Sequence, residues 1–302
     1  MTIGSGRSGL RLSGIHAALV TPFKADESLD EDRLASHLDF LLAAGVQGVV
    51  PIGGCGEYVS LDRHERRRVV ELTVQLVNGR VPVTAGALAP STREVLEMGD
   101  AAAAAGASAL LVLPPYYIRP SLAGVVDHFQ CIAERIGLPI IAYNNPPRTG
   151  WAMNVEAVAE VAAIPGVVGL KECDRDLANV ATKIECVGER IAVLGGDDDL
   201  VYWMMLTGAA GAIMATANLA PRLCLELYAA CMRGDIASAL TLNRKLVALV
   251  RVRQGPNHPG PLKELMGMLG RSVGPPRRPL RSMTAEQRER AAALLARLGE
   301  IG

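Results

Sequence analysis

The sequence predicts a (β/α)8 TIM barrel with a small helical C-terminal domain, on the strength of three observations. From Gly14 onward, a short apolar run followed by an amphipathic segment recurs about every 25 to 30 residues. The apolar runs are continuous rather than alternating, which is typical of strands that are buried on both faces. Eight such strand–helix units follow one another, and this is the number that the barrel requires.

The expected strands lie at regular intervals, and a length of 302 residues accommodates one barrel with a small helical addition. We expect them near residues 15–20, 47–52, 81–86, 108–113, 139–143, 167–171, 191–195 and 211–215. A doubly wound open sheet is the alternative, but it more rarely uses eight consecutive units. No Gly-x-Gly-x-x-Gly turn follows any of the expected strands, and this favours the barrel.

Several of the segments between the strands begin with a residue that can cap a helix. These residues are Asp30, Asp62, Ser91, Ser121 and Asn154. Glu94 stands three residues after Ser91, which is the spacing of a capping box. We therefore expect helices to begin at these positions.

After the eighth expected strand, the chain carries no further strand signal. Helices are expected near 221–233, 235–253, 261–269 and 284–298, with Gly-Pro sequences interrupting them. The first of them closes the barrel, and the others form the C-terminal domain. The predicted organisation is a flexible segment over 1–13, the barrel over 14–233 and the helical domain over 234–302.

The composition excludes several classes of function. The 31 basic and 31 acidic side chains balance, so nothing favours a nucleic acid or an anionic membrane as partner. No apolar run approaches the length of a membrane span, and the N-terminus lacks a hydrophobic signal region. The six cysteines form no disulfide framework, which is typical of a cytoplasmic protein. The five histidines lack the spacing of a zinc site, so neither a metal nor another cofactor is expected.

Reactive side chains in such a barrel lie at the carboxyl ends of the strands. Lys171 ends the apolar run 167–170, where burial disfavours a charged ammonium group. A neutral lysine amine attacks carbonyl carbons and forms a Schiff base, for example with a 2-oxo acid such as pyruvate. The alternative is that Lys171 emerges into solvent or pairs with Glu172 or Asp174.

Tyr143 and Arg148 follow the preceding strand, which is expected to lie next to the strand that carries Lys171. The phenol of Tyr143 can shuttle protons during imine and enamine formation, and its alternative role is that of a core aromatic residue. Arg148 can bind a substrate carboxylate through two hydrogen bonds. The alternative for Arg148 is a surface arginine that pairs with a loop carbonyl.

Glycines surround Cys55 at the end of the second expected strand, in Gly53-Gly54-Cys55-Gly56. Glycine lets the backbone approach a ligand closely and present its N–H groups as a nest for an anion. We therefore expect Gly53, Gly54 and Cys55 to bind a substrate carboxylate. A tight strand-to-helix turn is the alternative explanation.

Together these strand ends resemble the dihydrodipicolinate synthase/N-acetylneuraminate lyase family of class I aldolases. The resemblance covers roughly residues 14–283 and rests on three motifs in a fixed order. These are Gly-x-x-Gly-Glu at 53–57, Tyr-Asn-x-Pro at 143–146 and Lys171 on the next strand. The resemblance implies a lyase that forms a Schiff base between Lys171 and a 2-oxo acid, and then makes or cleaves a carbon–carbon bond.

The resemblance also implies roles for further residues. Gly196 and Ile213 match the wall of the substrate pocket. Tyr117 matches a catalytic tyrosine that reaches into the site of a neighbouring subunit, so a homodimer or a homotetramer is expected. Arg148 matches an arginine that, in the synthases, binds the carboxylate of the aldehyde partner.

The chain departs from the family pattern at two places. Synthases usually carry two threonines where this chain has Gly54 and Cys55, and Gly54 has no hydroxyl to link two tyrosines into a proton relay. We therefore expect a catabolic relative of the lysine-pathway synthase. The alternatives are a 2-keto-3-deoxy sugar acid aldolase or dehydratase and a deaminase of a hydroxylated pyrroline carboxylate.

The segment 57–66 departs from the family's allosteric lysine site, so no feedback inhibition by lysine is expected.

Two hypotheses belong to other classes. A non-catalytic regulatory protein that binds 2-oxo acids would keep the barrel and lose turnover, and the missing threonine hydroxyl is its support. A metal-dependent aldolase would need a set of metal ligands that the sequence does not offer. Lys171, Tyr143 and Arg148 together favour the enzyme.

Overall fold

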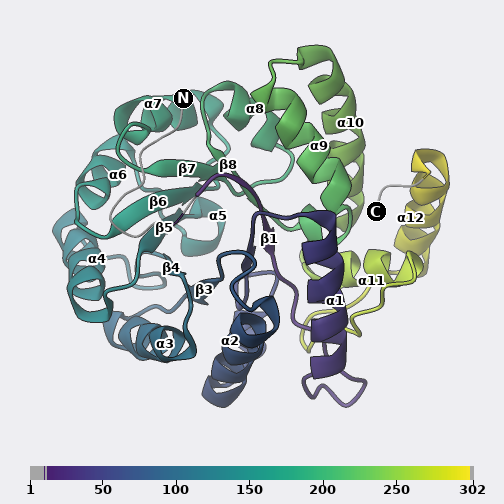
Figure 1. Ribbon diagram of the computed structural model, residues 1–302, viewed down its shortest axis with the longest axis horizontal. Helices are drawn as coiled ribbons and strands as arrows, with labels where there is room; N and C mark the ends of the chain where they lie inside the picture. The colour runs from purple at the N-terminus through teal and green to yellow at the C-terminus, as the bar shows by residue number, and fades with distance from the viewer. Residues whose placement is uncertain (1–9, 11, 300–302) are drawn as a thin grey trace.

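The computed structural model describes residues 10 and 12–299, and it confirms the predicted barrel (Figure 1). Eight parallel strands pair in the order β2-β1-β8-β7-β6-β5-β4-β3. A parallel bridge between Val49 and Val83 joins the two ends of this order, so the sheet closes and is not an open doubly wound sheet. The strands are Gly14–Ala18 (β1), Gly48–Val50 (β2), Thr84–Ala87 (β3), Ala109–Val112 (β4), Ile140–Asn144 (β5), Val167–Glu172 (β6), Ala192–Gly195 (β7) and Gly211–Met214 (β8).

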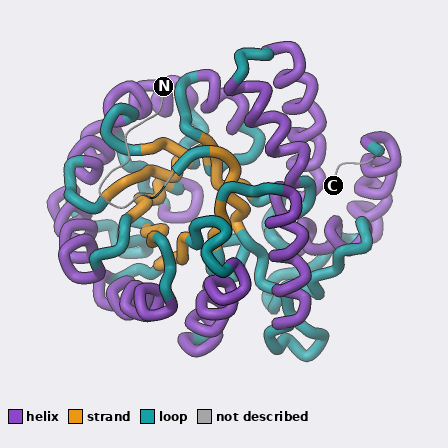
Figure 2. The backbone as a smooth tube through the Cα atoms, in the orientation of Figure 1, coloured by secondary structure: helices purple, strands orange, loops and turns teal. Residues whose placement is uncertain are grey.

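Helices surround the strands, as Figure 2 shows. One longer helix follows each strand, and a short helix α5 (Pro146–Thr149) lies directly after β5. Single turns of 3-10 helix, η1 (Tyr58–Ser60) and η2 (Thr216–Asn218), follow β2 and β8. The longer helices are Glu31–Ala44 (α1), Arg63–Val77 (α2), Thr92–Ala105 (α3), Leu122–Ile136 (α4), Val155–Ala162 (α6), Leu177–Val187 (α7), Val201–Leu206 (α8) and Pro221–Met232 (α9).

The predicted helix starts are confirmed. The side chain of each predicted cap accepts a hydrogen bond from a backbone N–H of the first turn, at Asp30, Asp62, Ser91, Ser121 and Asn154. The capping box expected at Ser91 is only half formed, because Glu94 pairs with Arg66 of α2 at 2.9 Å. A complete box occurs instead at the start of α2, where the Glu65 side chain accepts from the backbone N–H of Asp62.

The predicted C-terminal helices are α10 (Ile236–Arg253), α11 (Gly260–Met268) and α12 (Ala285–Leu298); α10 packs against α9, and α11 and α12 pack against α10 (Figure 1). Leu246 of α10 and Leu262 of α11 belong to the same core cluster as Leu19 and Leu227 of the barrel region. The predicted division at residue 234 therefore stays a prediction, since apolar packing continues across it. Of the predicted flexible segment 1–13, residues 1–9 and 11 lie outside the described residues. Within residues 10 and 12–299, no helix is long and apolar enough to cross a membrane.

Candidate active site

Lys171 and Tyr143 lie side by side at the carboxyl ends of β6 and β5. The two residues are in register in the parallel ladder, so their side chains point to the same face of the sheet. The Lys171 Nζ atom lies 4.3 Å from the centroid of the Tyr143 ring. Both side chains are buried, with 7% and 8% of their surfaces exposed. The structure therefore brings the predicted amine and the predicted phenol into contact.

Lys171 has no carboxylate within 4.0 Å of its amine among the described residues. The next residue, Glu172, points to the opposite face of β6 and pairs with Lys183 of α7 at 3.0 Å. Lys183 also lies 3.0 Å from Asp174. The alternative in which Lys171 pairs with these two acids is therefore wrong, because Lys183 occupies both.

Tyr143 is a buried, neutral phenol. Burial raises its pKa well above the usual value of 10, and Cys173 beside it acts in the same direction. The Asn145 side chain donates a hydrogen bond of 2.6 Å to the Tyr143 hydroxyl, which fixes the position of the oxygen. The phenol can give and regain a proton beside Lys171 while staying protonated at rest.

Gly196 and Ile213, the two predicted pocket-wall residues, lie on the same side of the sheet as Lys171. A Cβ atom on Gly196 would lie 2.9 Å from Cε of Lys171 and would overlap the sulfur of Cys173, so only glycine leaves room for the lysine. Ile213 stands two residues after Gly211, which is in register with Leu194. Because side chains alternate along a strand, Ile213 points to the same face as Lys171, which is also in register with Leu194.

The loop Gly53–Gly56 curls tightly after β2. A Cβ atom on Gly56 would lie 2.9 Å from the backbone nitrogen of Ile52, so this position requires glycine, whereas Gly53 and Gly54 border open space. The Thr21 hydroxyl donates to the Gly56 carbonyl at 2.7 Å and holds the loop. The backbone N–H groups of Gly54 and Cys55 have no acceptor among the described residues. Backbone N–H groups without an acceptor are able to bind an anion, and the predicted binding of a carboxylate here stays a prediction.

Cys55 contacts a residue that sequence reasoning missed. Its sulfur lies 3.3 Å from Nε2 of His258, in the loop between α10 and α11. Burial raises the pKa of Cys55 to about 11, although the nearby Lys171 opposes this shift. Burial also lowers the pKa of His258 to about 3, and the charge of Arg253 adds to the effect. The thiol and the imidazole are therefore both neutral, and no motif in the sequence signalled their contact.

Arg148 lies on α5, directly after the strand that carries Tyr143. Its side chain is exposed, and no carboxylate lies within 4.0 Å of it in the part of the chain that the structure describes. Its positive charge is a smaller influence that opposes the rise in the pKa of Cys55 and adds to the lowering of the pKa of His258. The exposed guanidinium of Arg148 is therefore available to an anionic group.

Tyr117 does not join the site of its own chain. Its side chain is 93% exposed, so it does not pack against the buried Lys171. Its backbone has a φ of 72°, a left-handed conformation that is uncommon for a residue with a bulky side chain. The preceding Tyr116 turns inward, and its hydroxyl lies 3.1 Å from that of Tyr58.

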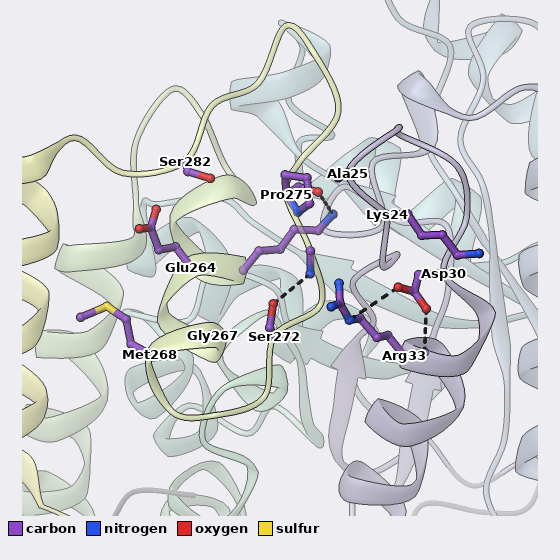
Figure 3. A pocket seen from close by; sticks show the side chains of 12 residues that line it. Lys24, Ala25, Asp30, Arg33, Glu264, Gly267, Met268, Ser272, Pro275 and Ser282 are labelled. Atoms are coloured by element: carbon purple, nitrogen blue, oxygen red, sulfur yellow. Dashed lines mark hydrogen bonds and ion pairs between the residues drawn. The ribbon is translucent and has the colours of Figure 1, made fainter.

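The larger of the two described cavities lies away from Lys171. Its volume is about 670 Å³, and it opens between the β1–α1 loop and α11, as Figure 3 shows. Arg33 and Asp30 pair with each other at its edge at 3.5 Å. Lys263 reaches past its wall to a buried ion pair with Glu57, directly after the glycine loop. This cavity therefore borders Lys263, whose ion pair holds the loop after β2, and its lining does not include Lys171. No cluster of three or more potential metal ligands occurs within the described residues.

The fold and these strand-end side chains define a TIM-barrel enzyme with a buried lysine at its centre. Comparison with known proteins assigns the family. The sequence profile of the dihydrodipicolinate synthetase family matches residues 11–298. The chain belongs to this family, and it is an enzyme of the lyase class.

Several relatives carry the name 4-hydroxy-tetrahydrodipicolinate synthase, and two of them illustrate the similarity. The protein of Methanothrix thermoacetophila is 39% identical, over 95% of this chain and 97% of its own length. That of Pseudomonas aeruginosa is 40% identical, over 86% of this chain and 89% of its own length. Among solved structures, dihydrodipicolinate synthase of Aquifex aeolicus superimposes with a TM-score of 0.91 at 31% identity, over 95% and 98% of the two chains. A pyruvate complex of the Acinetobacter baumannii synthase gives 0.91 at 33%, over 95% and 98%.

Proposed function

We propose that this enzyme forms a Schiff base between Lys171 and pyruvate or another 2-oxo acid, and catalyses aldol-type condensation or cleavage. The observation that carries the proposal is the contact of a buried lysine with the Tyr143 ring at 4.3 Å, with no carboxylate within 4.0 Å of the amine among residues 10 and 12–299. An amine without an ion-pair partner loses little when it gives up its proton and attacks a ketone. The solved complex of the Acinetobacter baumannii relative with pyruvate supports the choice of ligand.

In the proposed mechanism, the amine of Lys171 adds to the ketone carbon, and loss of water leaves an imine. Removal of a proton from C3 gives an enamine, which adds to an aldehyde, and the reverse sequence cleaves a carbon–carbon bond. Tyr143 carries protons to and from the carbinolamine oxygen, while Asn145 holds its hydroxyl in place. The N–H groups of Gly54 and Cys55 bind the carboxylate of the 2-oxo acid.

Two residues bear on the identity of the substrate. Arg148, exposed and without a carboxylate partner among the described residues, favours a substrate with a second anionic or polar end. Gly54 leaves open space where a hydroxyl would complete the relay of a lysine-pathway synthase. We therefore propose a catabolic relative of the synthase, with a 2-keto-3-deoxy sugar acid aldolase or dehydratase and a hydroxypyrroline carboxylate deaminase as alternatives. The names of the relatives support the synthase itself.

We further propose that the enzyme works as a homodimer or a homotetramer. The Tyr117 side chain is exposed and its backbone is in a left-handed conformation, and this supports a role in the site of a partner subunit. One solved relative is described as a monomeric dihydrodipicolinate synthase variant, so the family does not fix the assembly. Light scattering combined with a Tyr117→Phe assay tests this part of the proposal.

The decisive experiment is reduction with borohydride in the presence of 2-oxo acids. Reduction converts an imine into a stable secondary amine, so each bound acid adds its own mass to the peptide that carries Lys171. We expect a pyruvyl adduct on Lys171, and its absence at saturating pyruvate would contradict the proposal. A panel of hydroxylated and deoxy 2-oxo acids, assayed for turnover, then separates the catabolic reactions from the synthase.

A further inference from the structure

The segment 253–263 connects α10 to α11 and reaches the barrel at three points spaced five residues apart. Arg253 pairs with the buried Asp198 after β7, and Lys263 pairs with the buried Glu57 after β2. His258, midway between them, contacts Cys55. Two buried ion pairs therefore fix both ends of the segment, and the imidazole between them is held in place before any ligand arrives.

The contact between Cys55 and His258 is a hydrogen bond between neutral groups. The distance of 3.3 Å is within the range for a bond to sulfur. Burial, the dominant influence, lowers the pKa of His258 to about 3, and the cations Arg253, Arg148 and Lys171 outweigh the opposing Asp198. The imidazole therefore carries a single proton at neutral pH, on one nitrogen or the other.

The nitrogen that carries this proton determines whether the Cys55 thiol donates its hydrogen bond to His258 or to a ligand. If Nε2 carried no proton, the Cys55 thiol would donate to it and would have nothing left to offer a ligand. If Nε2 carries the proton, the imidazole donates to the sulfur, and the S–H group is free to point elsewhere. The N–H groups of Gly54 and Cys55, which have no acceptor in the part of the chain that the structure describes, lie in the same loop, so this tautomer adds a third donor beside them.

We propose that His258 is a positioning residue, which donates a hydrogen bond to Cys55 and thereby directs the thiol proton toward the carboxylate of the 2-oxo acid. Cys55 touches the substrate, and His258 acts through Cys55. The inference rests on the proposed imine at Lys171, because that bond places the carboxylate beside the loop. It assigns a residue of the C-terminal helical region to the recognition of the substrate anion.

Two probes separate recognition of the anion from formation of the imine. Pyruvate carries the carboxylate, and pyruvamide offers the same ketone with a neutral amide. The measurement is the concentration of each probe that gives half-maximal borohydride-trapped adduct on Lys171, together with the maximal adduct. We expect His258→Leu to raise the half-maximal pyruvate concentration about tenfold, the equivalent of one hydrogen bond to a charged group. The value for pyruvamide should change by less than about twofold.

The matched variants make the test specific. Cys55→Ala should reproduce the effect of His258→Leu, and the double variant should be no worse than either, because both remove one interaction. His258→Asn and Cys55→Ser keep donors and should restore most of the affinity for pyruvate. His64→Leu and Cys186→Ala change an exposed histidine and an exposed cysteine, and they should have no effect.

Several outcomes would overturn the inference. Equal losses for pyruvate and pyruvamide would show that His258 merely supports the fold, as would failure of His258→Asn to recover affinity. Multiplied losses in the double variant would show that the two residues act separately. If no variant loses affinity for pyruvate while the wild-type adduct forms, only this inference fails. If the wild type forms no adduct at all, the proposed function fails and this inference fails with it.

Discussion

Two neighbouring residues of strand β6, Lys171 and Glu172, point to opposite faces of the sheet and differ in whether they are ion-paired. On the inner face, the Lys171 amine lies against the Tyr143 ring, with no carboxylate within 4.0 Å among the described residues. On the outer face, Glu172 is fully buried and accepts hydrogen bonds from Lys183 at 3.0 Å and from Asn144 at 2.7 Å. Strand β6 thus has a buried lysine on each side: Lys183 is ion-paired, and Lys171 has no ion pair within the described residues.

The difference teaches how burial alone fails to identify a reactive group. Lys183 is more deeply buried than Lys171, at 0% against 7% exposed, yet its charge is neutralised by Glu172 and Asp174. A paired charge holds the structure together, whereas an unpaired amine at a strand end is available for chemistry. Substitutions on the two faces should therefore separate stability from activity.

The largest expected effect is on the inner face. Lys171→Ala removes the amine that forms the imine, so turnover should fall by more than about a thousandfold and no borohydride adduct should form. The free energy of unfolding should change little, because Lys171 forms no ion pair with any of the described residues. Steady-state assays, mass spectrometry and urea unfolding measure the three quantities, with Lys245→Ala, an exposed lysine, as the control. Full turnover by the variant would contradict the proposed function.

The opposite pattern is expected on the outer face. Lys183→Met leaves the carboxylate of Glu172 buried without its cation, so the free energy of unfolding should fall by about 3–5 kcal/mol. Any folded fraction should still form the adduct on Lys171. Combining Lys183→Met with Glu172→Gln should recover part of the stability, because the double variant leaves no charge at Glu172. Urea unfolding followed by circular dichroism provides the measurement, and unchanged stability would refute the contrast.

Tyr143→Phe sharpens the description of the inner face. The phenyl ring preserves the packing against Lys171 and removes only the hydroxyl, so turnover should fall by about a hundredfold or more, as expected for loss of a proton carrier. The adduct should still form with pyruvate, although more slowly. Stopped-time trapping with borohydride measures the rate. Tyr228→Phe, a half-buried tyrosine of α9, is the control, and equal effects of both changes would argue against a role for Tyr143.

Three buried histidines extend the comparison to side chains that burial keeps neutral. Burial lowers the pKa values of His16, His37 and His128 to about 4, from 6.5 in the unfolded chain. The unfolded state therefore takes up protons first as the solution is acidified, and stability present above pH 6.5 is lost as the pH falls toward 4. At pH 5 the loss should be roughly 2 kcal/mol for each histidine. Urea unfolding at several pH values measures it.

A variant isolates the contribution of one histidine. His37→Gln keeps an amide that can bond Asn218, which lies 2.9 Å from Nε2 of His37, but it removes the titrating group. The difference between this variant and the wild type should vanish or reverse with acidification, because only the wild type carries the penalty. Glu172 and Asp197, whose pKa values burial raises, are common to both proteins and cancel. An unchanged dependence on pH would contradict the assignment.

The smallest expected effect is that of lysine added as a ligand. The Tyr58 hydroxyl bonds that of Tyr116, and Arg66 pairs with Glu94, so these polar groups of the segment 57–66, where no lysine site is expected, already have partners. Millimolar lysine should change neither the melting temperature nor turnover, whereas pyruvate should raise the melting temperature by binding the folded state. A rise with lysine would show that the segment 57–66 still binds an effector.

The sequence predicted the barrel because each strand–helix unit carries its own local signals. Continuous apolar runs, capping residues such as Asp62 and breaks at glycine and proline act over a few residues. The contact between Lys171 and Tyr143 also followed from local information, since consecutive units form adjacent parallel strands. The capping box expected at Ser91 formed only in part because Arg66, on a neighbouring helix, competes for Glu94.

The sequence by itself determined the order of strands, the lysine at the end of β6 and the family to which both point. Tertiary structure alone decided the partners of the buried polar groups. Cys55 and His258 are 203 residues apart, and Glu57 meets Lys263 only because α11 packs near the loop after β2. Hydrophobic periodicity is a property of local sequence. The partners of charged and hydrogen-bonding side chains depend instead on which surfaces come together when the apolar faces are buried.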